Sequence, residues 1–327
     1  MENNQTESPI QIQKYHYTLP IGMSPSKIES IKEQLSYALN GEIEITTHNH
    51  IVTITCYKGS LPTDIPYTLP SQLSNTLIVP IGYSLSSNLI TINMASDSHC
   101  NLLGGGYQGT GKSTLANGII YSILQYPPEW VRIILIDLKM GVELKQWSIS
   151  HPNHIWLQAY DPEKSELKHT LTMLNKEIRK RYQLFEKYKV KDIHQYRKQV
   201  APLNYLFLVI DEFAELSSSK DGDDMQTLLK RTLQIGRAAG LRTIIFTQRP
   251  VVESITGSIK ALFPDRIAMR CATKLESRII LDQDGAEQLE DTPGRALFLS
   301  SAKLTKVQVM NYQDEYNESI NTTKTTI

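Results

Sequence analysis

The chain has 327 residues, of which 40% are hydrophobic and 21% are charged, and its 34 basic residues balance its 34 acidic ones. A chain of this length can form a large globular domain with its own core and a smaller second domain. The formal net charge of zero neither supports nor excludes nucleic acid, since a phosphate-binding surface would then need basic side chains concentrated in one place.

The cysteines and the apolar runs exclude further classes of protein. Cys56, Cys100 and Cys271 are far apart, and no C-x-x-C pair or histidine at ligand spacing accompanies them, so neither a disulfide framework nor a zinc site is indicated. The amino terminus has no basic segment followed by an apolar one, and runs such as 206–210 are far shorter than the roughly 20 residues of a membrane span. We therefore expect a cytoplasmic protein that reaches a membrane only through a partner.

The composition along the chain predicts two tails, a small α/β module and a large α/β domain. The tails are polar and are expected to be disordered. The expected segments are a tail at 1–15, the module at 16–75, the large domain at 76–313 and a second tail at 314–327.

The small module is expected to contain one helix and one hairpin. Ser24 and Pro25 are typical of the N-cap and first position of a helix, which would end at Asn40 before Gly41. Segments 42–46 and 51–56 then alternate apolar and polar residues around a polar turn, which predicts a β-hairpin.

Residues 104–114 carry the clearest functional signal. From Gly106 they match the phosphate-loop pattern G-x-x-x-x-G-K-[ST] at every fixed position, and chance alone would produce such a match in about 1% of chains of this length. Residues 101–103 can end a strand, and apolar residues recur at helical spacing over 115–124, as a strand, loop and helix require. The pattern predicts a nucleoside triphosphate site.

Each part of the phosphate loop has an expected chemical role. Glycines let consecutive backbone N–H groups turn toward a β-phosphate, and the amino end of the following helix adds its dipole. Lys112 can reach the β- and γ-oxygens, and the Ser113 hydroxyl can bind Mg²⁺. With ATP and Mg²⁺ as cofactors, the expected binding residues are Gly106, Gly109, Thr110, Gly111, Lys112, Ser113 and Thr114.

From about residue 77 onward, apolar segments alternate with helical ones. This alternation predicts an α/β fold with a mostly parallel central sheet flanked by helices. A long helix is expected from Asp161 to about Tyr188, with a basic row that we interpret as a solvated face in preference to a DNA site. The candidate strands are 131–136, 154–158, 206–210 and 241–246, and the basic row is Lys176, Arg179, Lys180, Arg181 and Lys187.

Two carboxylates follow the strand at 206–210. Asp211 can hold Mg²⁺ through water, and Glu212 can orient and polarise the attacking water. An apolar strand ending in acidic residues is common by itself. Together with a phosphate loop it indicates a Walker B segment, and the acidic pair favours hydrolysis of the nucleotide over binding alone. Gln248 follows the strand at 241–246 and is the expected sensor of the γ-phosphate, provided that the strands are neighbours.

The order and spacing of these motifs resemble those of a known family. The motifs are Gly104–Thr114, I-D-L-K at 136–139, V-I-D-E-F-A-E-L at 209–216, R-A-A-G at 237–240 and T-Q-R-P at 247–250, with further similar segments at 255–260, 265–268, 277–283 and 285–289. Together they resemble the FtsK/SpoIIIE-type DNA translocases of the HerA-FtsK superfamily. The resemblance covers roughly residues 20–312.

The resemblance implies a RecA-like motor domain at 76–313 that assembles as a ring, usually a hexamer, around double-stranded DNA. Such a ring moves along DNA by sequential ATP hydrolysis. Neutral subunits can still follow phosphates, because each presents a few cations to a shared channel. By its place in the family's motifs, Arg237 would reach the γ-phosphate of the neighbouring subunit and stabilise charge in the transition state.

The resemblance also implies which residues contact DNA. The matching channel-loop positions are Arg249, Lys260, Lys274 and Arg278, with Arg266 and Arg295 as weaker candidates. Alternatively, Arg249 and Arg278 hold loop carboxylates.

The sequence departs from the chromosomal members of the family, which usually carry a membrane region and a winged-helix module. We expect neither in this chain. Segment 137–144 differs from the Asp-Pro-Lys form and carries an extra residue, and segment 293–297 looks more like members attached to mobile elements and secretion systems. These features favour a motor for DNA transfer or segregation of a plasmid, conjugative element or phage, with a membrane or relaxosome protein as partner.

Two other functions remain open from the sequence. A protein-secretion ATPase of the same superfamily would pass a polypeptide through its channel, although the T-Q-R-P and S-R-x-x-L-D segments favour DNA. A nucleotide-gated assembly or partition factor would bind DNA without moving. A motor displaces a triplex-forming third strand from duplex DNA, whereas a static binder leaves it in place.

Overall fold

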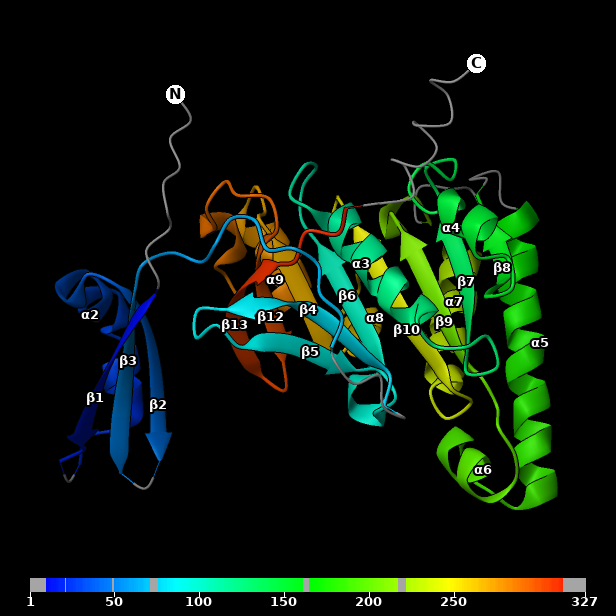
Figure 1. The fold of residues 1–327 in the computed structure, drawn as a ribbon, viewed down its shortest axis with the longest axis horizontal. Helices are drawn as coiled ribbons and strands as arrows, with labels where there is room; N and C mark the ends of the chain where they lie inside the picture. Colours follow the sequence, from blue (N-terminus) through cyan, green and yellow to red (C-terminus); the bar gives the residue numbers. More distant parts are fainter. Residues whose placement is uncertain are drawn as a thin grey trace. The chain divides into compact units, whose positions relative to one another are not determined.

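The structure is a computed structural model (Figure 1), in which the chain forms two compact units. The small unit comprises residues 1–62 with 83–89, and the large unit comprises 63–82 with 90–327. The expected tail segments 1–9 and 314–327 lie outside the described residues. Those residues are 10–20, 22–48, 50–70, 76–160, 165–216 and 222–313.

The small unit contains a three-stranded antiparallel sheet of order β1-β3-β2, against which two short helices pack. The hairpin predicted after Gly41 is confirmed, and Asn40 ends the second helix in the left-handed conformation, with φ of 50°. The single helix expected here is divided at Ser30 and Ile31. The elements are β1 (Gln11–Thr18), α1 (Pro25–Glu29), α2 (Lys32–Leu39), β2 (Glu42–His48) and β3 (Ile51–Lys58).

The prediction of a tail through residue 15 is wrong for residues 11–15, which belong to β1. This edge strand pairs with β3 from Gln11 to Thr18, and nearly all of its side chains are exposed. An exposed edge strand needs no apolar alternation, so its sequence resembles that of a polar tail.

The large unit contains the main part of a ten-stranded sheet of order β5-β4-β13-β12-β11-β6-β10-β9-β7-β8. The strands from β11 to β8 in this order are parallel, and β12 and β13 continue the sheet in antiparallel pairs. The predicted mostly parallel sheet is confirmed. The strands are β4 (Ile78–Ser84), β5 (Leu89–Asn93), β6 (Asn101–Gly105), β7 (Val131–Asp137), β8 (Ile155–Ala159), β9 (Tyr205–Asp211), β10 (Leu241–Thr247), β11 (Asp265–Met269), β12 (Arg295–Ser300) and β13 (Lys303–Val309).

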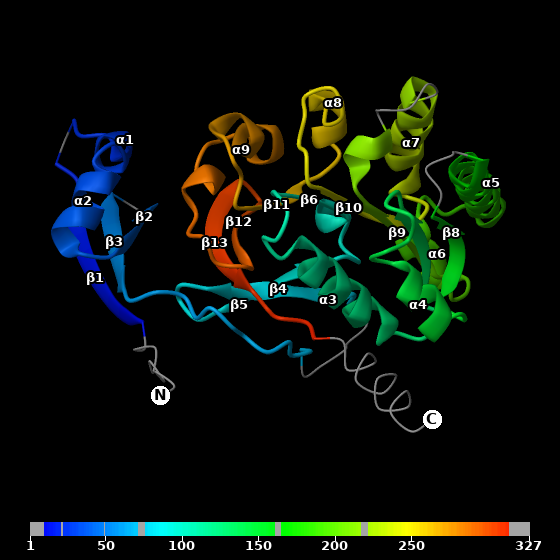
Figure 2. The same cartoon turned by 90° about the horizontal axis from the view of Figure 1, so that it is seen from above.

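Helices cover both faces of the parallel region, as Figure 2 shows: α3 and α4 lie on one face, and α5, α7, α8 and α9 on the other. Strands β9 and β10 are consequently buried along their whole length, which explains the unbroken apolar run at 206–210 in β9, whereas β10 also buries Arg242 and Thr243. The helices are α3 (Lys112–Leu124), α4 (Lys145–Ser150), α5 (Ser165–Tyr188), α6 (Ile193–Gln199), α7 (Gly222–Gly236), α8 (Gly257–Lys260) and α9 (Lys274–Leu281).

The long helix predicted up to Tyr188 is confirmed from Ser165 onward, and its predicted start at 161–163 lies outside the described residues. Its basic row is exposed with one exception. Arg181 is only 2% exposed, so its assignment to a solvated face is wrong. Short 3-10 helices complete the described part of the large unit: η1 (Asp97–His99), η2 (Phe213–Leu216) and η3 (Ala286–Gln288). Among the described helices, none is both long and apolar enough to cross a membrane.

Candidate nucleotide site

The phosphate loop connects β6 to α3 at the carboxyl edge of the parallel strands, as the sequence predicts. Gly106, Gly109 and Gly111 have φ values of 147°, 82° and 100°, a region that other residues rarely adopt. A Cβ on Gly111 would lie only 2.9 Å from the backbone nitrogen of Gly294. Both the backbone conformation and the close packing therefore require glycine here.

Polar groups of the loop converge on one carbonyl oxygen. Thr110 Oγ1 and Lys112 Nζ both donate hydrogen bonds to the carbonyl of Tyr107, at 2.8 and 2.6 Å. Burial, and then the positive charge of Lys139, lower the pKa of Lys112 to about 8. An anion at the loop would favour the ammonium form of Lys112, so the side chain suits phosphate oxygens. Ser113 and Thr114 lie in the first turn of α3.

The Walker B carboxylates lie close to this loop because β10 is flanked by β6 on one side and β9 on the other. Asp211 ends β9, and Glu212 follows with a left-handed φ of 58°. Glu212 Oε1 accepts hydrogen bonds from the Thr247 hydroxyl at 3.0 Å and from the Gln248 backbone N–H at 3.2 Å. The end of β10 thus fixes the Glu212 carboxylate. The strand neighbours assumed for Gln248 are confirmed, while the sensor role of its side chain stays a prediction.

Lys139 lies beside both carboxylates, a position that sequence reasoning missed. Its Nζ is 3.3 Å from Glu212 Oε2 and 3.6 Å from Asp211 Oδ2. Even so, neither Lys139 Nζ nor Asp211 Oδ2 has a hydrogen-bond partner among the described residues. Burial raises the pKa of Asp211 to about 6, and the charge of Lys139 opposes this rise. The buried, unpartnered oxygen of Asp211 therefore fits the expected Mg²⁺ role.

A tight turn after β7 brings Lys139 to the site. Asp137 is fully buried, and its carboxylate accepts hydrogen bonds from the backbone N–H groups of Lys139, Glu143 and Leu144 at 3.0, 2.9 and 3.0 Å. Met140 and Gly141 have positive φ values of 63° and 75°. The only sequence signal for this arrangement is an acidic residue at the end of a buried strand.

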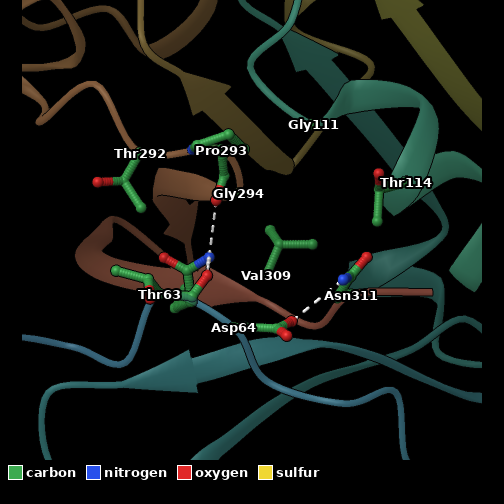
Figure 3. A pocket seen from close by; sticks show the side chains of 10 residues that line it. Thr63, Asp64, Gly111, Thr114, Thr292, Pro293, Gly294, Val309 and Asn311 are labelled. Atoms are coloured by element: carbon green, nitrogen blue, oxygen red, sulfur yellow. Dashed lines mark hydrogen bonds between the residues drawn. The ribbon is translucent and has the colours of Figure 1, made fainter. Parts of the chain in front are cut away.

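A pocket with a volume of about 250 Å³ adjoins the phosphate loop (Figure 3). Gly111 and Thr114 line one side, and residues from 63–64, 292–294 and 308–311 line the rest. Asn311 donates a hydrogen bond to the Asp64 carboxylate at 3.1 Å, and these two side chains face each other in Figure 3. A concave site with a few fixed polar groups beside a phosphate loop is suited to the base and ribose of a nucleotide.

Arg237 is exposed in the turn between α7 and β10. It precedes the amino end of β10, whereas the phosphate loop follows the carboxyl end of the parallel neighbour β6. The seven residues of β10 span roughly 23 Å, farther than an arginine side chain extends. Arg237 therefore lies at the opposite edge of the sheet from its own phosphate loop and cannot reach it.

The residues expected to contact DNA fall into two groups. Arg249 and Lys274 are exposed. Arg278 instead forms a bidentate pair with Asp284 at 2.5 and 2.9 Å, and Lys260 Nζ lies 2.5 Å from Asp282. The alternative in which Arg278 holds a loop carboxylate is thus confirmed for this structure.

The two weaker basic candidates also have carboxylate neighbours. Arg266 pairs with Asp282. Arg295 is 3% exposed, and its Nε lies 3.6 Å from Glu290. The interpretation of Arg295 as a DNA-contacting residue is wrong, because a buried guanidinium cannot meet the phosphate backbone.

Comparison with known proteins decides the family. The sequence model of the FtsK/SpoIIIE family matches residues 71–204. The chain is 33% identical over 311 residues to the DNA translocase FtsK of Chlorobaculum tepidum, an alignment that covers 86% of this chain and 37% of that protein. The chain belongs to the FtsK/SpoIIIE family. It spans less than half of the length of the curated FtsK relatives that it matches.

Solved structures share the fold of this FtsK/SpoIIIE-family chain. The pCW3 conjugation coupling protein TcpA, in a monomer form with ATPγS, is 24% identical, with a TM-score of 0.69 and coverage of 97% of this chain and 91% of that chain. The cytoplasmic domain of the type VII secretion ATPase EccC of Thermomonospora curvata is 22% identical, with a TM-score of 0.65 and coverage of 77% and 32%. The predicted RecA-like P-loop ATPase fold is confirmed.

The raised pKa of Asp211 predicts how stability varies with pH in the metal-free protein. The folded value is about 6 and the ordinary value is 3.8, so the contribution of this group is present below pH 4 and is lost as the pH rises through 6. Relative to Asp211→Asn, the wild type should lose about 2 kcal/mol of unfolding free energy between pH 4.5 and 7.5. Urea denaturation with EDTA measures the difference, and an equal difference at both pH values would contradict the prediction.

Proposed function

We propose that this chain is an ATPase that couples ATP hydrolysis to movement along double-stranded DNA, as one subunit of a ring, most simply a hexamer. The observation that carries the proposal is the sheet order β6-β10-β9. It brings the phosphate loop and the Walker B carboxylates to one edge and leaves Arg237 at the other. A site of this kind is complete only when a second subunit supplies Arg237.

The residues of the site have separate roles in the proposed reaction. Lys112 and the loop N–H groups bind the β- and γ-phosphates, and Ser113 and Asp211 hold Mg²⁺, which neutralises charge that develops on the phosphate oxygens. Glu212, held by Thr247 and by the backbone of Gln248, orients the attacking water. The pocket beside Gly111 binds the base and ribose.

Contacts with DNA are proposed for the exposed loops that follow β10 and β11. Lys274 and Arg249 can meet phosphates directly, whereas Lys260 and Arg278 must exchange Asp282 and Asp284 for phosphate groups. We therefore expect Lys274 to contribute more than Arg278 to the binding of DNA, because an existing bidentate pair competes with phosphate. The segments at 137–144 and 293–297 support a setting in DNA transfer, with a membrane or relaxosome protein as partner.

The proposal predicts that duplex DNA stimulates ATP hydrolysis, and that turnover rises cooperatively with protein concentration. Lys274→Ala should reduce DNA stimulation several-fold and lower the salt dependence of DNA binding by about one unit of slope, with basal turnover unchanged. Lys187→Ala, which removes an exposed lysine from α5, is the matched control and should behave as wild type.

Turnover at low salt, with and without linear duplex DNA, is the decisive measurement. Hydrolysis that is indifferent to both DNA and protein concentration would contradict a ring-shaped DNA motor. Displacement of a triplex-forming strand then separates movement from static binding.

A further inference from the structure

The backbone of the turn that carries Arg237 is held at every carbonyl group. The turn comprises residues 237–240. The Arg237 carbonyl accepts hydrogen bonds from Gly240 N–H at 3.0 Å and from Arg242 Nη1 at 3.1 Å. The Ala238 carbonyl accepts one from Ile193 N–H at 2.9 Å, and the Ala239 carbonyl accepts one from Arg181 Nη1 at 2.9 Å. The Gly240 carbonyl accepts one from Leu206 N–H at 3.0 Å. The donors outside the turn come from α6, α5, β9 and β10. Four separate elements therefore fix one turn, in which Arg237 is exposed and Ala239 and Gly240 are buried.

Gly240 limits the turn further. Its φ is +89°, and a Cβ at this position would collide with the Ile193 side chain. Any other residue would be strained both by its backbone conformation and by the lack of space. The turn therefore depends on glycine at position 240.

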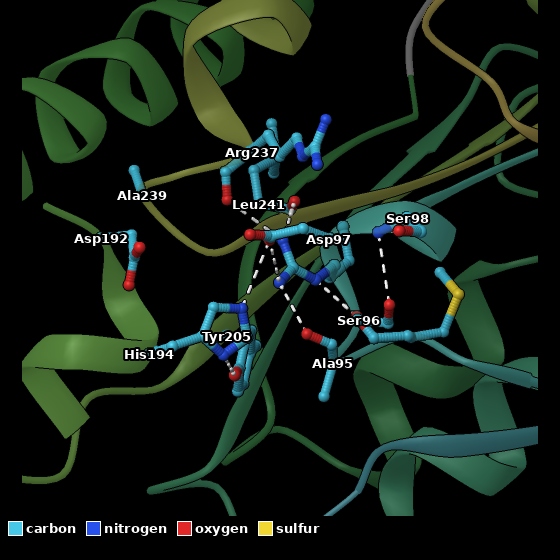
Figure 4. Close-up of polar contacts among 12 residues, drawn as sticks. Ala95, Ser96, Asp97, Ser98, Asp192, His194, Tyr205, Arg237, Ala239 and Leu241 are labelled. Carbon is cyan, nitrogen blue, oxygen red and sulfur yellow. Dashed lines mark hydrogen bonds and ion pairs between the residues drawn. The ribbon is translucent and has the colours of Figure 1, made fainter. Parts of the chain in front are cut away.

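Two of the donors to the turn are buried guanidinium groups. Arg242 is 0% exposed and also donates to the carbonyls of Met94, Ala95 and Leu241 at 2.5, 3.2 and 2.9 Å, with the ring of Tyr205 at 4.9 Å. Asp97 lies 3.5 Å from Arg242 and 3.3 Å from His194 at the rim of this network (Figure 4).

Arg181 is the second buried guanidinium and reaches the turn from α5. It donates hydrogen bonds to the backbone carbonyl and the side-chain oxygen of Asn204, at 2.7 and 2.6 Å, and to the Glu177 carboxylate at 3.0 Å. Burial lowers the pKa of both arginines. Apolar residues could fill such space at no electrostatic cost, so buried guanidiniums that bind backbone carbonyls indicate that a defined geometry is being maintained.

The side chain of Arg237 contrasts with its backbone. It is exposed, and in Figure 4 it extends away from the network while its carbonyl faces it. A fixed origin for a long side chain restricts the positions that its guanidinium can reach, which lowers the entropy lost when it binds a target. The backbone of Arg237 is thus fixed by hydrogen bonds, while its guanidinium is exposed.

We propose that Arg181 and Arg242 are positioning residues that present Arg237 to the triphosphate on a neighbouring subunit. This inference rests on the proposed action of Arg237 between subunits. It predicts that a substitution at Arg181 impairs hydrolysis in the next subunit and leaves the phosphate loop of its own subunit competent.

Mixed rings test this direction of action. Arg181→Gln subunits alone should hydrolyse ATP at least tenfold more slowly than wild type, and Arg181→Lys should recover part of the loss. Lys112→Ala subunits are inactive at their own loop but keep Arg237 in place. Mixing Lys112→Ala with Arg181→Gln subunits should raise ATP turnover several-fold above that of either variant alone. A mixture of Lys112→Ala with Arg237→Ala subunits should show the same gain.

A matched control separates positioning from damage to the fold. Arg197 stacks on Trp130 at 4.8 Å and on Tyr205, the ring that Arg242 also contacts, at 5.1 Å, but it donates to the Leu203 carbonyl and not to the turn that carries Arg237. Any activity that Arg197→Ala loses should not return on mixing with Lys112→Ala.

The outcomes distinguish the inference from the proposed function. The positioning role alone is overturned if Arg181→Gln subunits keep full ATPase activity. It is also overturned if mixing with Lys112→Ala restores the activity of Arg237→Ala subunits but not that of Arg181→Gln subunits. Full activity of Arg237→Ala overturns the proposed action of Arg237 itself. Arg181 and Arg242 each donate four side-chain hydrogen bonds, so Arg242→Lys is tested in the same mixtures, and a loss of activity that Lys112→Ala subunits fail to restore overturns the positioning role of Arg242.

Discussion

Replacement of Glu212 by glutamine is expected to lower kcat for ATP hydrolysis by about 10²–10⁴-fold, while ATP affinity stays within a few-fold of the wild type. The amide keeps the size of the side chain, and its oxygen can still accept from Thr247 and the Gln248 backbone. It cannot take a proton from water, and it loses the ion pair with Lys139. The change therefore removes the step that activates water and leaves the binding surface intact.

Steady-state hydrolysis and equilibrium binding of a fluorescent ATP analogue measure the two effects separately. Lys112→Ala is the control that should lose both, because Lys112 is placed at the phosphates. Thr247→Val removes one hydrogen bond to Glu212 without changing its charge, and we expect a loss of less than tenfold in kcat. If Glu212→Gln raises KM but leaves kcat unchanged, then Glu212 contributes to binding alone and the assigned role is incorrect.

The nucleotide site could be predicted because its requirements are local in sequence. Phosphate binding demands glycines at Gly106 and Gly111 and a lysine at position 112, and the fold supplies the positive φ values that this pattern implies. Strand β9 has an unbroken apolar sequence up to Ile210, so the carboxylates at its end could be located from sequence as well.

Other parts of the site depend on contacts that no local pattern records. Lys139 reaches the carboxylates only because the turn held by Asp137 follows a neighbouring strand. Helical periodicity placed Arg181 in a basic row, but the carbonyl of Ala239, 58 residues away in sequence, accepts a hydrogen bond from it inside the fold. Long-range pairing of this kind cannot be read from a single segment.

Several strands were also missed for physical reasons. Strands β11 and β12 are mostly buried but begin with the charged residues Asp265 and Arg295, and β13 mixes lysines with apolar side chains. Strand β4 contains a proline and a glycine, residue types that are depleted in strands. Short strands with weak alternation resemble loops until their partners in the sheet are known.

Removal of the Asp137 carboxylate is expected to have the largest effect on stability among single substitutions near the site. Asp137→Ala leaves three backbone N–H groups of a buried turn without their acceptor, and each such group costs about 1–3 kcal/mol. We expect the free energy of unfolding to fall by about 3–5 kcal/mol. Urea denaturation of the wild type and the variant measures the change.

Asp192→Ala is the matched control, because this aspartate accepts a single backbone hydrogen bond, from Gln195 at 2.9 Å, as the N-cap of α6. Its loss should cost about 1 kcal/mol. An equal cost for the two variants would show that the turn after β7 keeps its shape without the carboxylate. If Asp137→Ala is the more costly, its effect should extend to the site, because the Asp137 carboxylate fixes the backbone from which Lys139 reaches Asp211 and Glu212.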